Sequence, residues 1–251
     1  MGVAGMSEGP SSDDSMAGAH WRDHRDADAM AVAVASALAD AIQSAVSARG
    51  AAILALAGGN TPWPAYQRLS KEDLPWERVV LIPSDDRLVP SGDPLSNLTA
   101  LAKIFEPLGV RVEALADATL IADHRAAGIA ADARLRGLPW PLDYVLLGVG
   151  GDGHTASLFP GEDYAAAVDP HSSARALGVL PDPLPASAPV ARVSLSLAAI
   201  SCARAVGIAA TGPAKRAVIE AAIEAGDSSP FPIGRVLAAL QTPVRIHWAH
   251  Q

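Results

Sequence analysis

The sequence contains a single cysteine, Cys202, so an intrachain disulfide is excluded and a reducing compartment is favoured. It also has no continuous apolar run of about 18 residues, the length that crosses a bilayer as a helix. Its longest apolar runs have the length of strands instead. We therefore expect a protein without a membrane partner.

Positive charge is scarce as well. The chain has 19 lysines and arginines against 27 acidic residues, a formal net charge of −8. Nucleic-acid binding is normally accompanied by a basic patch, so we expect no nucleic-acid partner. The charge does not exclude an anionic small molecule, for which a few converging cations are enough.

The first 20 residues lack both periodicity and the features of a signal peptide, namely a basic start and a continuous apolar core. We predict a disordered tail over residues 1–20 and a cytoplasmic location. Residues 21–251 are long enough to bury one full core, although two small domains would also fit the length. We predict one catalytic domain there.

Strand-like and helix-like segments alternate along this domain. Predicted strands cover residues 51–57, 79–83, 112–115, 143–148, 192–197, 205–210 and 244–248. Predicted helices cover residues 25–49, 96–105, 123–136, 211–225 and 232–240. This alternation predicts an α/β fold, a three-layer α/β/α sandwich with a mostly parallel, Rossmann-like sheet. Residues 170–189 are interrupted by prolines and glycines, which indicates a surface loop or lid.

A glycine-rich loop that ends in a histidine follows the predicted strand at residues 143–148. Glycines allow backbone amides to close on a ligand, and histidine transfers protons near neutral pH. We predict that His154 acts as general base and acid, that Asp152 orients it, and that the amides of Gly150 and Gly151 face an oxyanion. The alternative is a histidine that is merely hydrogen-bonded within its loop. No Gly-x-Ser-x-Gly elbow follows any of the predicted strands, so a serine nucleophile is not indicated.

The sequence contains little evidence for a bound cofactor or metal ion. The run Gly148-Val-Gly-Gly-Asp-Gly153 formally matches the dinucleotide fingerprint, but Pro160-Gly161 would end the following helix early, and no acidic strand end lies about 20 residues further on. Two histidine pairs, His20 with His24 and His247 with His250, lack carboxylate or cysteine partners at ligand spacing. We expect no cofactor and no metal.

Further candidate residues lie where strands end or helices begin. Gly58, Gly59, Asn60 and Thr61 form a predicted anion cradle, in which Thr61 caps a helix that starts with Pro62. The loop lacks the Gly-Lys-Ser/Thr of a nucleotide P-loop, which favours a phosphate monoester or sugar hydroxyls over ATP. The alternative is a plain tight turn.

Charged and amide side chains complete the candidate site. Asp85 and Arg87 directly follow a predicted strand, Asn97 begins a helix, and Arg192 and Lys215 can bind phosphate as a bidentate fork and a point charge. Because ligands bind beyond the carboxyl ends of parallel strands, we expect these residues to converge. The alternatives are a salt-bridged loop, a helix cap and solvated surface charges.

Four blocks of the sequence resemble the lactonase branch of the glucosamine-6-phosphate isomerase/6-phosphogluconolactonase superfamily. They are Leu56-Ala-Gly-Gly-Asn-Thr-Pro62; Ser84-Asp-Asp-Arg-Leu-Val89 with Ser96-Asn97; Leu147-Gly-Val-Gly-Gly-Asp-Gly-His-Thr-Ala-Ser-Leu-Phe-Pro160; and Arg192-Val-Ser with Gly212-Pro-Ala-Lys215. The resemblance implies hydrolysis of 6-phospho-D-glucono-1,5-lactone to 6-phosphogluconate in the pentose phosphate pathway, without metal or nucleotide. Asp86 stands where this family usually has glutamate.

The resemblance also implies roles for individual residues. His154 would be the general base, Asp85 and Arg87 would lie near the lactone, and Arg192 and Lys215 would hold the phosphate together with residues 58–61. The expected partner is a phosphorylated sugar lactone, and we expect a monomer or weak homodimer.

Two rival functions remain open at this point. A glucosamine 6-phosphate isomerase or deaminase typically has Ile-Ala-Phe-Asn-Glu-Pro after the histidine, which the Thr155-Ala-Ser-Leu-Phe-Pro160 of this chain does not match. A non-catalytic sugar-phosphate sensor usually carries a DNA-binding segment, for which the first 25 residues are too short and too acidic.

Overall fold

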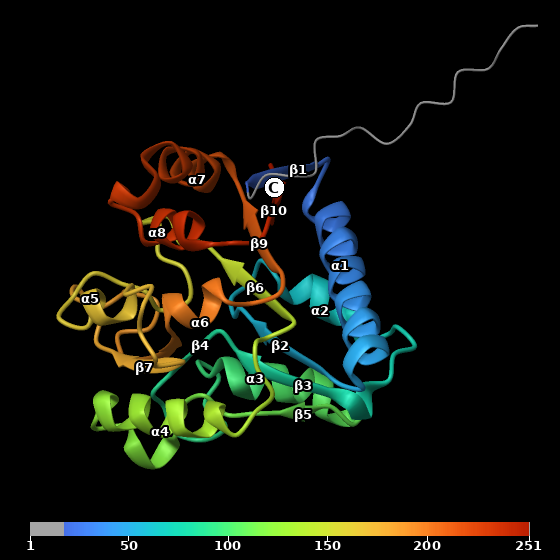
Figure 1. The fold of residues 1–251 in the computed structure, drawn as a ribbon, viewed down its shortest axis with the longest axis horizontal. Helices are drawn as coiled ribbons and strands as arrows, with labels where there is room; N and C mark the ends of the chain where they lie inside the picture. Colours follow the sequence, from blue (N-terminus) through green and yellow to red (C-terminus); the bar gives the residue numbers. More distant parts are fainter. Residues whose placement is uncertain (1–17, 251) are drawn as a thin grey trace, which may run out of the picture.

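A parallel seven-stranded sheet forms the centre of the computed structural model, which describes residues 18–250 (Figure 1). Its strand order is β1-β10-β9-β6-β2-β3-β5, and every neighbouring pair is parallel. The strands are β1 (Ala19–His24), β2 (Ala52–Leu56), β3 (Val79–Pro83), β5 (Arg111–Val112), β6 (Tyr144–Gly148), β9 (Val206–Thr211) and β10 (Val244–Ala249). Because all strands run the same way, the loops after β2, β3, β6 and β9 meet at one edge.

Helices cover both faces of this sheet, which confirms the predicted α/β/α sandwich. The helices are α1 (Ala27–Arg49), α2 (Trp63–Leu69), α3 (Asn97–Phe105), α4 (His124–Arg136), α5 (Tyr164–Ala167), α6 (Leu197–Ser201), α7 (Pro213–Ala225) and α8 (Pro232–Ala239). Figure 1 shows α1 and α2 on one side of the strands and α6, α7 and α8 on the other. Short 3₁₀ turns lie at Trp76–Arg78, Glu106–Leu108, Ala118–Leu120 and Gly226–Ser228.

Two apolar cores result from this layering. In β2, Leu54 and Leu56 pack in the core beneath α1, α2 and α3, whereas Ile53 and Ala55 pack in the core shared with α4, α7 and α8. All five residues of β2 are buried, as expected for a central strand with both faces covered.

A second, three-stranded sheet lies beside the main one. It has the antiparallel order β4-β8-β7, formed by β4 (Asp85–Arg87), β8 (Arg192–Leu195) and β7 (Ala176–Val179). In the β4–β8 ladder Asp85 pairs with Ser194, and Arg87 lies directly opposite Arg192. Two charged candidates of the sequence analysis, far apart along the chain, are thus neighbours.

The prediction of a loop or lid over residues 170–189 is wrong for Ala176–Val179, which form β7. The strand is hard to recognise in the sequence because it contains a glycine, Gly178. Together with Gly128, this glycine allows β7 to lie directly against α4. A Cβ atom on Gly178 would lie 1.7 Å from the carbonyl oxygen of His124. Only glycine permits this approach of strand and helix.

The N-terminal prediction needs one correction. Residues 19 and 20, assigned to the tail, begin β1, while residues 1–17 lie outside the described part of the chain. Helix α1 contains no continuous apolar run of about 18 residues, but by length and composition it could cross a membrane, with 23 residues and a mean hydropathy of 1.6 in one 18-residue window. Here α1 is a core helix with seven buried residues, capped by Asp26 and ended by Gly50 at φ 80°.

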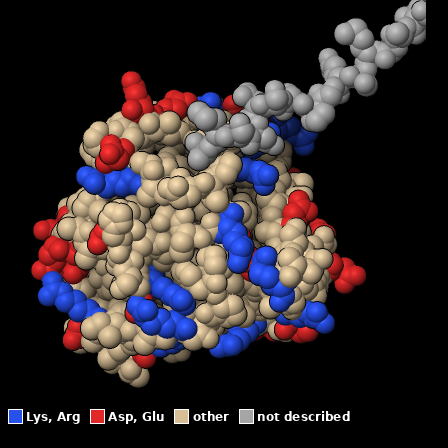
Figure 2. Space-filling model, viewed as in Figure 1, with Lys and Arg blue, Asp and Glu red and all other residues tan. Residues whose placement is uncertain are grey.

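Charged side chains on the face drawn in Figure 2 are dispersed among uncharged areas. Several lysine and arginine side chains lie near one another right of the centre, and most acidic side chains lie nearer the edges.

Candidate active site

A cavity of about 220 Å³ opens at the edge where the parallel strands end. Residues that follow β2, β3, β6 and β9 line it, joined by one residue of β8. The predicted site residues in its wall are Gly58, Gly59, Asn60, Thr61, Asp85, Arg87, Asn97, Gly150, His154, Arg192 and Lys215. The structure therefore brings together all predicted site residues except Asp152 and Gly151.

Asp152 does not line the cavity, but it contacts His154, which does. Its Oδ1 atom lies 2.5 Å from Nδ1 of the imidazole and also accepts from the backbone amide of His154 at 3.2 Å. The hydrogen bond from the His154 side chain lowers the pKa of Asp152 to about 2. Asp152 is thus a carboxylate at neutral pH, and it engages Nδ1, which leaves Nε2 as the nitrogen that can exchange a proton with a substrate or water.

The loop that carries His154 is held by close contacts of its glycines. Gly153 has φ 80°, and a Cβ atom there would lie 2.6 Å from the ring of Phe231. The carbonyl group of Gly153 accepts the amide of Ile233 in the first turn of α8 at 3.0 Å. Ala156 adopts a left-handed conformation, φ 46°, which is uncommon for a residue with a Cβ atom. The chain thus turns sharply on both sides of the histidine.

The predicted oxyanion role of the two glycine amides is not supported by this geometry. The amide of Gly150 donates to the carbonyl oxygen of His154 at 2.9 Å, so it already has a partner. Gly151 is exposed and is not part of the cavity wall. The sequence shows that these glycines are close to the histidine, but not that their loop closes on itself.

The buried carboxylate of Asp85 holds several segments of the site together by hydrogen bonds. Its Oδ2 atom accepts from the hydroxyl of Ser157 at 2.5 Å, and Oδ1 accepts from Ser84 at 3.3 Å. The amide of Ser157 in turn donates to Ser194 on β8 at 3.1 Å. This network joins β4, β8 and the His154 loop. Ser84 and Ser157 are residues that the sequence analysis did not select, although both belong to the motif blocks.

Asp86 does not face the cavity. Its buried carboxylate accepts from the amide of Asn97 at 2.7 Å, from the hydroxyl of Ser96 at 3.0 Å and from the amide of Leu98 at 3.3 Å. Desolvation raises the pKa of Asp86 to about 6 despite these hydrogen bonds. Asp86 therefore stabilises the start of α3.

Three cationic side chains line the cavity: Arg87, Arg192 and Lys215. Among the described residues, none of the three forms an ion pair with a carboxylate. Arg192 is only 3% exposed, which overturns the alternative of a solvated surface charge. Its guanidinium donates to the carbonyl oxygen of Ala188 at 3.2 Å, and burial lowers its pKa. Burial also lowers the pKa of Lys215, in the first turn of α7. Such groups favour an anionic ligand.

The loop after β2 has a different local structure from the predicted one. Helix α2 begins at Trp63 after Pro62, with no side-chain cap, so the prediction that Thr61 caps it is wrong. Gly58 instead allows Asn97 to pack against its backbone, since a Cβ atom there would lie 1.9 Å from the Asn97 side-chain oxygen. Asn97 also donates to the carbonyl oxygen of Asp85 at 2.8 Å. This asparagine fixes the distance between two walls of the cavity.

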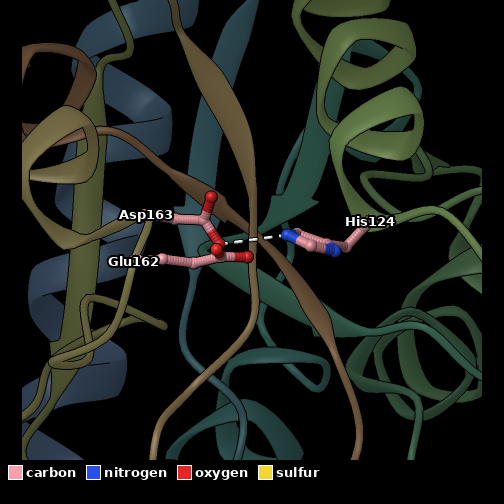
Figure 3. Close-up of side chains that lie close together, drawn as sticks. All are labelled: His124, Glu162 and Asp163. Carbon is pink, nitrogen blue, oxygen red and sulfur yellow. Dashed lines mark hydrogen bonds and ion pairs between the residues drawn. The ribbon is translucent and has the colours of Figure 1, made fainter.

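A cluster of His124, Glu162 and Asp163 lies outside this site (Figure 3). Nε2 of His124 is 3.0 Å from Asp163, which also accepts the amide of Leu180 at 3.1 Å. Arg125 pairs with both acids, at 3.0 Å from Glu162 and 3.4 Å from Asp163. Because arginine already supplies a positive charge to both carboxylates, we assign the cluster a structural role: it fastens the segment before β7 to α4.

Two histidines from opposite ends of the chain also meet. The sheet register places β1 beside β10, and Nε2 of His24 lies 3.1 Å from Nδ1 of His247. Their rings are stacked with centroids 5.3 Å apart. Burial lowers the pKa of His247 to about 4, so this histidine is neutral at physiological pH.

Comparisons with known proteins agree with this geometry. Residues 25–248 match the sequence profile of a family described as glucosamine-6-phosphate isomerases/6-phosphogluconolactonase. A 6-phosphogluconolactonase of Mesorhizobium japonicum is 37% identical over 92% of this chain and 95% of its own, and one of Pseudomonas putida is 34% identical over 89% and 90%. The crystal structure of a 6-phosphogluconolactonase from Shewanella baltica has a TM-score of 0.83 at 30% identity, over 92% of this chain and 97% of that one.

Proposed function

The chain belongs to the glucosamine-6-phosphate isomerase/6-phosphogluconolactonase family, and from this premise we propose that it hydrolyses 6-phospho-D-glucono-1,5-lactone to 6-phospho-D-gluconate. The reaction opens a cyclic carboxylic ester and is a step of the pentose phosphate pathway. The observation that carries the proposal is the combination of a carboxylate-oriented histidine with three cations, none paired to a described carboxylate, in one sugar-sized cavity.

His154 is the proposed proton carrier. Nε2 takes a proton from a water molecule as its oxygen attacks C1 of the lactone, and Asp152 holds the proton on Nδ1 in the required tautomer. When the bond between C1 and the ring oxygen breaks, the imidazolium returns the proton to that oxygen. The products are a carboxylic acid, which ionises, and a free hydroxyl group. No covalent intermediate is required.

Phosphate binding is proposed for Arg192, Lys215 and the loop of residues 58–61. Burial of the amine lowers the pKa of Lys215, and a phosphate dianion beside it would offset this loss of hydration. Arg87 lies opposite Arg192 in the β4–β8 ladder, and its Nε atom has no hydrogen-bond partner within residues 18–250. We propose that Arg87 faces the negative charge that develops on the lactone oxygen, in place of the occupied Gly150 amide.

Other features remain expectations from the sequence. These are the absence of a metal requirement, a cytoplasmic location, a single catalytic domain over residues 21–251, and a monomer or weak homodimer. A metal requirement is tested by assaying the protein with and without chelator.

A coupled assay tests the activity directly. The lactone is made in situ, and 6-phosphogluconate formation is followed through its dehydrogenase, after subtraction of spontaneous lactone opening. Glucosamine 6-phosphate serves as the alternative substrate. Lactone turnover without deamination supports the proposal, turnover of glucosamine 6-phosphate alone would favour the isomerase or deaminase, and tight binding without either reaction would favour a sensor.

A further inference from the structure

Phe159 touches the two most important side chains of the proposed site. Its ring stacks on the imidazole of His154, with centroids 4.1 Å apart and an angle of 27° between the planes. The guanidinium carbon of Arg192 lies 4.8 Å from the centroid of the same phenyl ring. Phe159 is itself only 3% exposed, and its amide donates to the carbonyl oxygen of Ser157 at 3.1 Å. A fixed aromatic surface therefore lies beside the proton carrier.

The restraints on His154 and Arg192 are unequal. Arg192 lies in a strand and has its own hydrogen bonds, to the carbonyl of Ala188 and to Ser157. His154 lies in a glycine-rich loop with a side chain that is 30% exposed, and its hydrogen-bonding partner Asp152 is 61% exposed. An exposed pair of this kind does not fix an orientation well, because both side chains keep rotational freedom. The contact with Phe159 is the buried restraint on the imidazole.

We infer that Phe159 is a positioning residue, which holds the imidazole of His154 at the angle required for proton transfer. The inference rests on the proposed lactone hydrolysis. Stacking between aromatic rings, and between a ring and a cation, favours this arrangement in both protonation states of the histidine. Misplacement of a reacting group by about 1 Å can lower a rate by about a hundredfold, so a partial loss of orientation has a measurable effect.

The test compares Phe159→Leu with Phe231→Leu as a matched control. Phe231 packs against Gly153 in the same loop, so its replacement also loosens the loop but leaves the stacked ring in place. We expect Phe159→Leu to lower kcat about tenfold with KM changed less than about twofold, and Phe231→Leu, which keeps the stacked ring, to lower kcat clearly less, by about threefold at most. Phe159→Tyr, which keeps the aromatic face, should restore most of the lost rate. If the leucine variant is insoluble, Phe159→Met makes the same comparison.

An NMR measurement gives a second readout that does not depend on turnover. The ring current of Phe159 should shift the imidazole protons of His154 upfield in the wild-type protein and in Phe231→Leu, but not in Phe159→Leu; a His154→Asn variant identifies the signals. Equal effects of the two leucine substitutions on kcat, or imidazole shifts that do not respond to Phe159→Leu, would overturn the inference. An upfield-shifted His154 in a wild-type protein without lactonase activity would instead overturn the proposed function alone.

Discussion

The neighbouring glycines Gly150 and Gly151 allow a sharp test of the proposed catalytic pair. A Cβ atom at Gly150 would lie 2.2 Å from Cε1 and Nδ1 of His154 and 2.5 Å from Oδ1 of Asp152, whereas ordinary van der Waals contact begins at 3.4 Å. In Gly150→Ala the imidazole or the carboxylate must therefore move by about 1.2 Å. A displacement of this size is expected to lower kcat by about a hundredfold.

The adjacent substitution Gly151→Ala is the control. No atom of another described residue lies within 4 Å of a Cβ atom at this position, and neither glycine has a positive φ that alanine would resist. We expect Gly151→Ala to keep kcat within about twofold. Both variants are compared in the coupled lactone assay at saturating substrate, and thermal unfolding checks that each is folded. A fully active Gly150→Ala, or an equal loss in both variants, would refute the reasoning.

Three further predictions concern proton transfer, phosphate binding and pH. His154→Asn should lower kcat by about 10²–10⁴ with little change in KM, because it removes the proton carrier and leaves the cations in place; an unchanged kcat would refute this role. Lys215→Met should raise KM about tenfold or more at nearly constant kcat, as expected for a lost charged contact, and an unchanged KM would contradict the phosphate assignment. His247 should contribute a fall of up to about 3 kcal/mol in the free energy of unfolding between pH 7 and pH 4, since burial lowers its pKa to about 4 and only the unfolded state takes up the proton near pH 6.5. Urea titrations of the wild-type protein and His247→Gln at both pH values measure this difference, and an identical change in the two proteins would refute the contribution of His247.

The main sheet and the place of the site could be predicted because their signals are local. Each strand of the centre is an apolar run, and the loop residues after β2, β3, β6 and β9 belong to one edge in any parallel arrangement. This reasoning alone brings His154, Asp85 and Lys215 together. The edge strand β1 gives no such signal, because its exposed and half-buried residues alternate with charges between them.

What could not be predicted depends on contacts between distant segments. Asp86 looks like a site residue in the sequence, since it stands between Asp85 and Arg87, yet its carboxylate turns to the start of α3. The pairing of His24 with His247 exists only because two chain ends become adjacent strands. The amide of Gly150 already donates a hydrogen bond within its own loop, so it is not free to stabilise an oxyanion. Motif spacing gives the position of a residue, but not the direction of its side chain.

The register that sets Arg87 directly across from Arg192 has a practical consequence. Like charges opposite one another in an antiparallel ladder repel, and Arg87 contributes to the lowered pKa of Arg192. Inorganic phosphate bound at the proposed phosphate site of Arg192 and Lys215 would offset that repulsion, so it should raise the melting temperature by mass action and compete with the sugar phosphate. Kinetics recorded in phosphate buffer would then describe a partly inhibited protein, and a zwitterionic buffer is the better medium for every comparison of variants.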